Sequence, residues 1–241
     1  MIEPLLLTAA RIDTFLGAGR LTNASGFFFA RGDRLFLVTS CHGLRDDRAG
    51  HYPDRIEIKL HVDVNNLASS TGFSMPLYRN GRAVWRQGVD HGGAIDVAVV
   101  EIDRAALPLT TLYRAFTPDH LPGNCEQVEV GTSLLVVGFP LGFHDWLHHM
   151  PVVRQAIVAS SFGLRFQGEG YFLTDARTHR GTSGAPVVMR SVQPNPAHDD
   201  LPWTLLGIHS ARLDVARDLV VDEALGLNCA WYAEILMTLT Q

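Results

Sequence analysis

Cysteine is scarce in this sequence, and the few cysteines form no pattern. The 241 residues include three, Cys41, Cys125 and Cys229, an odd number without paired spacing. A small secreted domain that depends on disulfides would carry an even, regularly spaced set. The sequence therefore predicts a reducing environment inside the cell, in the cytoplasm.

Targeting and membrane-spanning signals are also missing. The first residues, from Met1 to Leu5, contain an acid and a proline but no basic residue, and the apolar stretch ends by Ala10. A secretory signal peptide needs a basic segment before its apolar core, so none is expected. No apolar run reaches the roughly 18 residues of a transmembrane helix, so no membrane span is expected either.

Basic runs are absent too, and the formal net charge is −5. Nucleic acid and anionic membranes attract concentrated positive charge, so neither is expected as a partner. Apolar residues make up 46% of the chain, which excludes a disordered protein and provides for a substantial core.

Short apolar runs separated by Gly, Asp, Asn and Pro indicate β-strands. We expect strands at residues 26–30, 35–39, 56–62, 96–102, 133–139, 152–161, 171–175, 185–190 and 204–210. Residues 191–202, with three prolines, are expected to form a surface loop. Only residues 230–239 have helical spacing, which places Trp231, Ile235, Leu236 and Leu239 on one face.

This pattern predicts an all-β protein made of two small β-barrels with a C-terminal helix. Residues 108–123 are rich in Pro, Leu and Thr, show no period, and are expected to cross between the barrels. We therefore expect an N-terminal barrel over residues 1–115 and a C-terminal barrel over residues 116–241.

Three polar side chains stand beside apolar runs in the order His, Asp, Ser. His42 follows one run, Asp96 opens another, and Ser183 lies between Gly181 and Gly184. A serine hydroxyl is a weak nucleophile; His42 could take its proton while Asp96 orients the imidazole. In such a turn the N–H groups of Gly181 and Ser183 can form an oxyanion hole. The three residues together predict a nucleophilic hydrolase.

The segments around these residues resemble those of a known family. LVTSCHGL, IDVAVVEI and RGTSGAPVV are similar to the histidine, aspartate and serine motifs of chymotrypsin-like proteases. VVGFPLG, followed by RQAIV, resembles the start of the second barrel in bacterial trypsin-like and high-temperature-requirement proteases. The resemblance covers roughly residues 20 to 240.

The resemblance implies a chymotrypsin-like double β-barrel with the triad in the cleft between the barrels. His42 and Asp96 would come from the first barrel and Ser183 from the second. A serine endopeptidase acting through an acyl-enzyme is implied, with protein or peptide substrates and no cofactor or metal. A protease of this kind needs restraint, which either a regulatory protein partner or a narrow range of substrates would provide.

Two residues depart from the family pattern. Cys41 stands where a small residue, usually alanine, precedes the histidine. Thr182 stands where animal trypsins have the aspartate that captures a newly cut N-terminus, so that route of activation is not expected.

The resemblance also points to a specificity pocket. Residues 206–210 match the strand that lines the primary pocket, with Ser210 at its common serine position. His209 and Thr178 match the histidine and the hydroxyl residue of glutamyl endopeptidases and of Gln-preferring picornaviral proteases. An imidazole and a hydroxyl can donate hydrogen bonds to a carboxylate or amide.

Three arginines, Arg177, Arg180 and Arg212, are expected near this pocket, where they would favour an anion. The prediction is cleavage after Glu, and less readily after Gln or Asp. Two alternatives stay open: His209 could be an ordinary core histidine, and Arg212 could fill the pocket rather than line it.

Other interpretations also stay open. The chain could be a silent relative that uses its cleft to bind a partner, or an esterase of the same geometry. His144 and His148 would share a face if their segment, which includes His149, were helical, and could then bind a metal. No cysteine or second acid lies nearby, so a surface loop shaping access to the cleft is the preferred interpretation.

Overall fold

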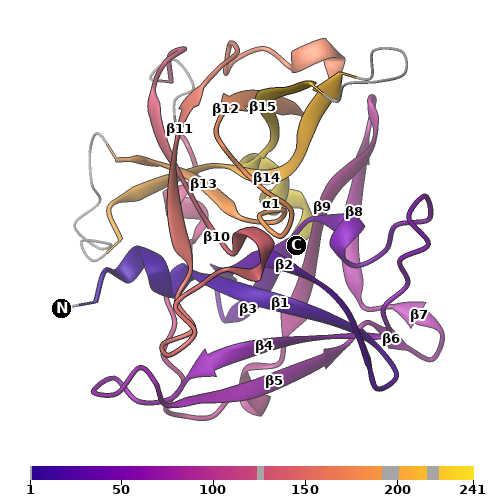
Figure 1. The fold of residues 1–241 in the computed structure, drawn as a ribbon, viewed down its shortest axis with the longest axis vertical. Coiled ribbons are helices and arrows are strands. Elements are labelled where there is room, and N and C mark those ends of the chain that lie inside the picture. Colours follow the sequence, from indigo (N-terminus) through magenta and orange to yellow (C-terminus); the bar gives the residue numbers. More distant parts are fainter. Residues whose placement is uncertain (1, 124–127, 192–200, 216–222) are drawn as a thin grey trace.

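The fold was analysed in a computed structural model of the chain (Figure 1). The structure describes residues 2–123, 128–191, 201–215 and 223–241, without the side chains of 211–215 and 223–225. Cys125 and most of the loop expected at 191–202 lie outside the described residues.

The N-terminal half forms an antiparallel sheet of seven strands, in the order β5-β4-β1-β2-β3-β9-β8. Its strands are β1 (Ala9–Leu16), β2 (Gly19–Arg31), β3 (Arg34–Thr39), β4 (Arg55–His61), β5 (Ser70–Pro76), β8 (Trp85–Asp90) and β9 (Gly93–Ile102). A small hairpin joins β6 (Tyr78–Arg79) to β7 (Arg82–Ala83). Short 3-10 helices lie at η1 (Pro4–Thr8), η2 (Cys41–Gly43), η3 (Arg104–Ala106) and η4 (Pro118–His120).

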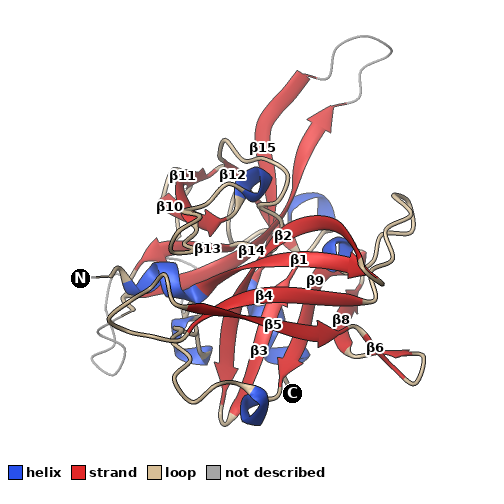
Figure 2. Cartoon of the chain, turned by 60° about the horizontal axis from the view of Figure 1, so that its bottom comes forward, coloured by secondary structure: helices blue, strands red, loops and turns tan. Residues whose placement is uncertain are grey.

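The C-terminal half forms a closed barrel in the order β10-β11-β12-β15-β14-β13. Its strands are β10 (Ser133–Gly138), β11 (Val152–Val158), β12 (Tyr171–Asp175), β13 (Pro186–Arg190), β14 (Trp203–Val215) and β15 (Glu223–Tyr232). Three 3-10 helices, η6 (Pro140–Gly142), η7 (Phe166–Gly168) and η9 (Ala233–Ile235), precede the helix α1 (Leu236–Leu239). Figure 2 shows β14 and β15 extending together beyond the barrel.

The apolar runs of the first sheet are continuous because both of its faces are covered. Side chains alternate between the two faces of a strand. In β2, Phe28 points into the N-terminal core with Leu35 and Leu37 of β3. Its neighbours Phe27 and Phe29 point the other way, into a core shared by the two halves.

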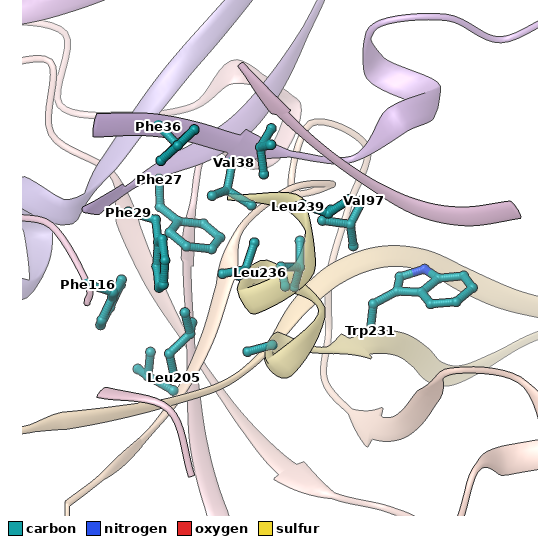
Figure 3. Close-up of a cluster of buried hydrophobic side chains, with 14 of the residues drawn as sticks. Phe27, Phe29, Phe36, Val38, Val97, Phe116, Leu205, Trp231, Leu236 and Leu239 are labelled. Atoms are coloured by element: carbon teal, nitrogen blue, oxygen red, sulfur yellow. The ribbon is translucent and has the colours of Figure 1, made fainter. Parts of the chain in front are cut away.

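The shared core holds the two halves together (Figure 3). Phe27, Phe36 and Val97 from the first sheet meet Leu205 and Trp231 from the barrel. Leu236 and Leu239 of α1 pack into the same cluster. A separate cluster, including Val136, Phe172, Val187 and Leu206, fills the barrel itself.

Each predicted strand is present, with ends shifted by up to seven residues, the largest shift being at the start of β2. The predicted helix over residues 230–239 was wrong in its first part. Residues 230–232 belong to β15, where Trp231 pairs with Tyr171 on one side and Ile208 on the other. Trp231 of β15 and the leucines of α1 all pack into the shared core. Their spacing therefore resembles one face of a single helix, although the residues belong to a strand and a separate short helix.

The division at residues 115 and 116 stays a prediction. No helix among the described residues is long and apolar enough to cross a membrane.

Candidate active site

His42 and Asp96 are brought together by two neighbouring strands. β3 and β9 pair from Leu35↔Ile102 to Thr39↔Ala98, so the end of β3 lies beside the start of β9. The Nδ1 atom of His42 is 2.6 Å from Oδ2 of Asp96, and the backbone N–H of His42 donates to Oδ1 at 2.8 Å. Both carboxylate oxygens therefore hold the same histidine.

The environment of His42 favours a basic imidazole. Burial alone would lower the pKa of His42, but the hydrogen bond and charge of Asp96, with the charge of Asp46, raise it above its usual value. The side chain is 40% exposed, so its outer ring edge is accessible. An accessible imidazole with a raised pKa is suited to accept a proton.

Ser183 lies in the turn before β13, next to β14. Its hydroxyl donates to the carbonyl oxygen of Ser210 at 2.7 Å. The hydroxyl of Ser210 in turn donates to Oδ2 of Asp96. Among the described residues no hydrogen bond joins Ser183 to His42, so Ser210 links the serine to the His42–Asp96 pair in this structure.

The turn needs glycine on both sides of Thr182 and Ser183. Gly181 and Gly184 both have φ +87°, a left-handed conformation that favours glycine. A Cβ at Gly181 would lie 2.7 Å from the carbonyl oxygen of Phe139, and one at Gly184 would collide with the carbonyl oxygen of Ser25. The glycine frame noted in the sequence is therefore required by backbone conformation and by packing.

The two predicted oxyanion-hole donors are not engaged by the described part of the protein. Neither the N–H of Gly181 nor that of Ser183 donates to another described residue. The carbonyl oxygen of Arg180 accepts from the N–H of Leu141 at 2.6 Å. Because C=O and N–H point in opposite directions in a trans peptide, this bond turns the Gly181 N–H away from Leu141. Leu141 itself has φ +56°, a strained conformation for a residue with a side chain.

Ser25 of β2 connects this turn to the N-terminal sheet, and sequence analysis missed it. Its hydroxyl donates to the carbonyl oxygen of Gly181 at 2.7 Å and accepts from the N–H of Phe139 at 2.9 Å. Its own N–H donates to the carbonyl oxygen of Ser183 at 2.9 Å. Nothing in the sequence marks this serine, since it sits inside an ordinary strand.

His209 is buried directly behind the turn. Its backbone carbonyl accepts from the N–H of Gly184 at 2.7 Å, and its N–H donates to the carbonyl of Ala185 at 2.9 Å. The side chain is 2% exposed, and its Nδ1 has no partner among the described residues. Burial, and then the charge of His42, lowers the pKa of His209 to about 4, so its imidazole is neutral at pH 7.

Thr178 is buried with its hydroxyl already engaged. Its Oγ1 donates to Oδ1 of Asn228 at 2.5 Å, and the Asn228 amide donates to the carbonyl of Ala176 at 2.7 Å. Asn228, on β15, was not singled out in the sequence. Because the Thr178 proton is used, this hydroxyl can offer a ligand only its lone pairs.

The described structure gives little support for the three arginines as lining of a specificity pocket. Arg177 and Arg180 have exposed side chains, and neither has an ion-pair partner among the described residues. Arg212 lies opposite Asn228 in the β14–β15 ladder, and its side chain is outside the described residues.

A wide depression of about 750 Å³ opens beside His42 and Asp96. Its lining includes Trp85, Gln87 and Ala94. The histidine is therefore reachable from solvent along the surface of β8 and β9.

Comparison with known proteins identifies the family of the chain. The sequence pattern of the trypsin-like peptidase domain matches residues 24–193, which include His42, Asp96 and Ser183. The chain belongs to the trypsin-like peptidase family. This membership supports the prediction of a serine endopeptidase, a hydrolase.

Solved structures show the same fold for this trypsin-like peptidase. The crystal structure of the serine endoprotease from Yersinia pestis matches with a TM-score of 0.55, 18% identity and 98% of this chain covered. The HtrA-type protease AlgW, solved with a tripeptide, matches with a TM-score of 0.57, 17% identity and 98% coverage. The match spans 62% and 60% of those two chains. No curated protein sequence matches significantly. The predicted all-β, chymotrypsin-like fold is confirmed.

Cys41 beside the histidine of this peptidase is a buried thiol. Burial, and then the charge of Asp96, raises the pKa of Cys41 to about 12. The thiolate is the reactive form of cysteine, so this residue stays an inert neighbour of His42.

The histidines at 144, 148 and 149 lie in a loop, and no helix places them on one face. His148 Nδ1 pairs with Asp145 Oδ2 at 2.7 Å, and His144 Nδ1 contacts the carbonyl oxygen of Gly142 at 2.6 Å. Among the described residues no group of three or more metal-ligating side chains has the geometry of a metal site.

Replacing Ser25 by alanine is expected to lower kcat about 10-fold with little change in KM. The carbonyl of Gly181 and the N–H of Phe139 would each lose a buried partner, at about 1–3 kcal/mol per group, and the turn would loosen. Steady-state kinetics and thermal unfolding measure the two effects. Ser74→Ala, an exposed serine on β5, is the control. A lowered Tm with unchanged kcat would show that Ser25 has no positioning role.

Proposed function

We propose that this peptidase hydrolyses peptide bonds through a Ser183–His42–Asp96 triad and an acyl-enzyme. The observation that carries the proposal is that both carboxylate oxygens of Asp96 form hydrogen bonds with His42. Beside this pair lie a serine flanked by glycines and two N–H donors without partners among the described residues. Asp96 fixes the tautomer in which Nδ1 carries the proton, which leaves Nε2 as the base.

The reaction follows from these positions. Ser183 Oγ attacks the substrate carbonyl as its proton passes to Nε2 of His42, and the oxyanion binds to the N–H groups of Gly181 and Ser183. His42 then gives the proton to the leaving amine, and the ester to Ser183 remains. A water molecule, activated by the same imidazole, hydrolyses the ester.

The Ser183 hydroxyl must first leave the carbonyl of Ser210. A rotation about its Cα–Cβ bond redirects the proton from Ser210 to His42. A substrate N–H group that donates to the Ser210 carbonyl would replace the hydroxyl there and so favour the reactive rotamer. Substrate binding and activation of the nucleophile would then be linked.

For specificity we propose a preference for Glu before the scissile bond, with Gln and Asp weaker. The unpartnered Nδ1 of His209 supports this, because a buried polar group without a partner is costly unless a ligand satisfies it. Thr178 supports it less, since its proton is given to Asn228. His209 would then be the principal donor to the substrate side chain.

Peptides that differ only in the residue before the scissile bond test this preference. We expect kcat/KM for Glu to exceed that for Leu, Phe and Arg by at least about 10-fold, and His209→Leu to remove most of the difference. His91→Leu, an exposed histidine between β8 and β9, is the control. Equal or better turnover after Leu, Phe or Arg would eliminate the preference while leaving the triad intact.

We also propose a reducing, cytoplasmic environment and a bacterial source. The two described cysteines, Cys41 and Cys229, are buried and free, which supports the reducing environment. The bacterial source rests on the resemblance of the sequence motifs. A regulatory protein partner stays a prediction.

Two other functions remain as alternatives to test. An esterase would turn over small esters but leave every protein and peptide intact, so casein and the peptide set separate it from a peptidase. A silent binding module would not react with a fluorophosphonate probe at Ser183.

A further inference from the structure

Strands β1 and β4 separate at one end of the N-terminal sheet. They pair at Asp13↔Glu57, Thr14↔Ile56 and Phe15↔Arg55. The same register would continue to Arg11 opposite Lys59 and Ala9 opposite His61, but neither of these pairs forms. The ladder between β1 and β4 is therefore only three residue pairs long, and the strands diverge beyond Asp13 and Glu57.

A cavity of about 90 Å³ occupies this gap. Its apolar floor consists of Leu7, Ala9, Ala10, Phe28, Leu60 and Leu112. The volume exceeds that of a single water molecule and is enough for a small organic group.

The barrel closes the cavity from the other side. The segment between β10 and β11 reaches across to β1 and β4 (Figure 1). There the His61 ring nitrogen Nε2 contacts the carbonyl oxygen of His148 at 2.6 Å. His144 and His149 of this segment line the cavity, and their rings stack with centroids 6.0 Å apart. A ligand in this position would touch both halves of the molecule.

The polar lining is mainly cationic. Lys59 is the one lysine of the whole sequence, and it has no ion-pair partner among the described residues. Arg11 donates from Nη2 to Asp13, but its Nε is buried without a partner among the described residues. Asp13, the one carboxylate in the described lining, is also bound by Arg20 at 2.6 Å and is therefore already neutralised.

The pKa of His149 also indicates a cationic environment. Burial lowers the pKa of its imidazole, and the remaining causes are all basic neighbours, namely His144, Lys59, His61 and Arg11. Beyond the Arg11–Asp13 pair, Lys59 adds one positive charge to the lining. The complementary ligand is a monoanion.

We propose that this cavity binds the carboxylate of a small ligand with a short apolar body. Lys59 and Arg11 Nε would donate to the carboxylate, and the apolar floor would hold the body, as in most small-ligand sites. The ligand could be a free short-chain acid or the C-terminal residue of a peptide. The inference does not depend on the proposed peptidase activity.

The single lysine gives a direct probe. Reductive methylation with ¹³C-formaldehyde labels Lys59 and the α-amino group while keeping their charges. Titration with isobutyrate is expected to give a saturable shift of the Lys59 methyl signal, with the α-amino signal as the reference for bulk salt. Isobutyramide, which has the same shape without charge, is expected to give none. A shift that never saturates, or an equal shift with isobutyramide, would overturn the proposal.

Calorimetry on the unmodified protein tests the residues. Lys59→Met is expected to weaken isobutyrate binding by about 10-fold or more, and His149→Gln to weaken it less. Arg79→Met removes an exposed charge on β6 that does not line the cavity, and should change nothing. Unchanged binding in Lys59→Met would place the ligand elsewhere.

Further ligands define the chemistry and its source. Inorganic phosphate should bind more weakly than isobutyrate; equal binding would mean a general cationic patch and would overturn the assignment. The tripeptide Ala-Ala-Val is then compared with its C-terminal amide. If the tripeptide with a free carboxylate binds more tightly than isobutyrate, peptide C-termini are the source of the ligand. If isobutyrate binds more tightly, the source is a free short-chain acid. Either result supports the carboxylate site.

Discussion

Replacing Ser183 by alanine is expected to lower kcat/KM by about 10⁴-fold or more and to abolish labelling by a fluorophosphonate probe. The substitution removes the nucleophile and leaves the two N–H donors, so only weak residual activity should survive. Folding should be preserved, because the Ser183 hydroxyl makes one hydrogen bond among the described residues, to the Ser210 carbonyl.

The measurement combines probe labelling with cleavage of casein and of the peptide set. Ser161→Ala, an exposed serine after β11, is the control and should behave as the wild type. Labelling that persists in Ser183→Ala would place the nucleophile elsewhere. A wild-type protein that resists the probe, though folded, would favour the silent binding module.

Replacing Asp96 by asparagine is expected to lower kcat by about 10⁴-fold. Asp96 accepts from three donors: the N–H of His42, Nδ1 of His42 and the hydroxyl of Ser210. The backbone N–H is always a donor, so the amide oxygen of the introduced side chain would face it. The amide NH₂ would then face Nδ1, which must become the acceptor, and the proton would move to Nε2 and block the base.

The pH profile checks this explanation. The pKa of His42 is raised in the wild type, and the neutral imidazole is the active form. Activity should therefore fall on acidification with a midpoint above the usual histidine pKa of about 6.5. In Asp96→Asn the carboxylate is gone, so the midpoint should move to lower pH. A profile that does not move would mean that Asp96 does not set the basicity of His42.

Ser210→Ala is the matched control for Asp96→Asn. It removes one donor to the same carboxylate oxygen without altering the His42 contacts. Its effect on kcat should be far smaller, because the tautomer of His42 is unchanged. If Ser210→Ala lowered kcat as much as Asp96→Asn does, the hydrogen-bond network of Asp96 and Ser210 together, rather than Asp96 alone, would orient His42.

The sequence predicted the elements that carry the site, because those elements follow local rules. Apolar runs marked the ends of β3 and β9, and glycines marked the turn around Ser183. The strand pattern and the resemblance of the motifs to a known family together indicated the fold. Motifs of this kind are visible because each is continuous along the chain.

Contacts between distant segments were not predictable from such rules. Ser25 reaches the turn 156 residues away, and Asn228 holds Thr178 across 50 residues. Neither side chain stands out in its own segment. Trp231 was misread for a related reason: its spacing from Leu236 suggested a helix, whereas the two residues come from different elements that enter one core.

The common core limits how the two halves of the chain can be engineered. Phe27 and Val97 are packed against Leu205 and Trp231, and Leu236 of α1 packs into the same cluster. Neither half could be exchanged for its counterpart from a distant relative without re-fitting the partner surface. A substitution that changes side-chain volume in one half would leave a cavity or a clash against the other half, so redesign of either half has to include the facing residues of its partner.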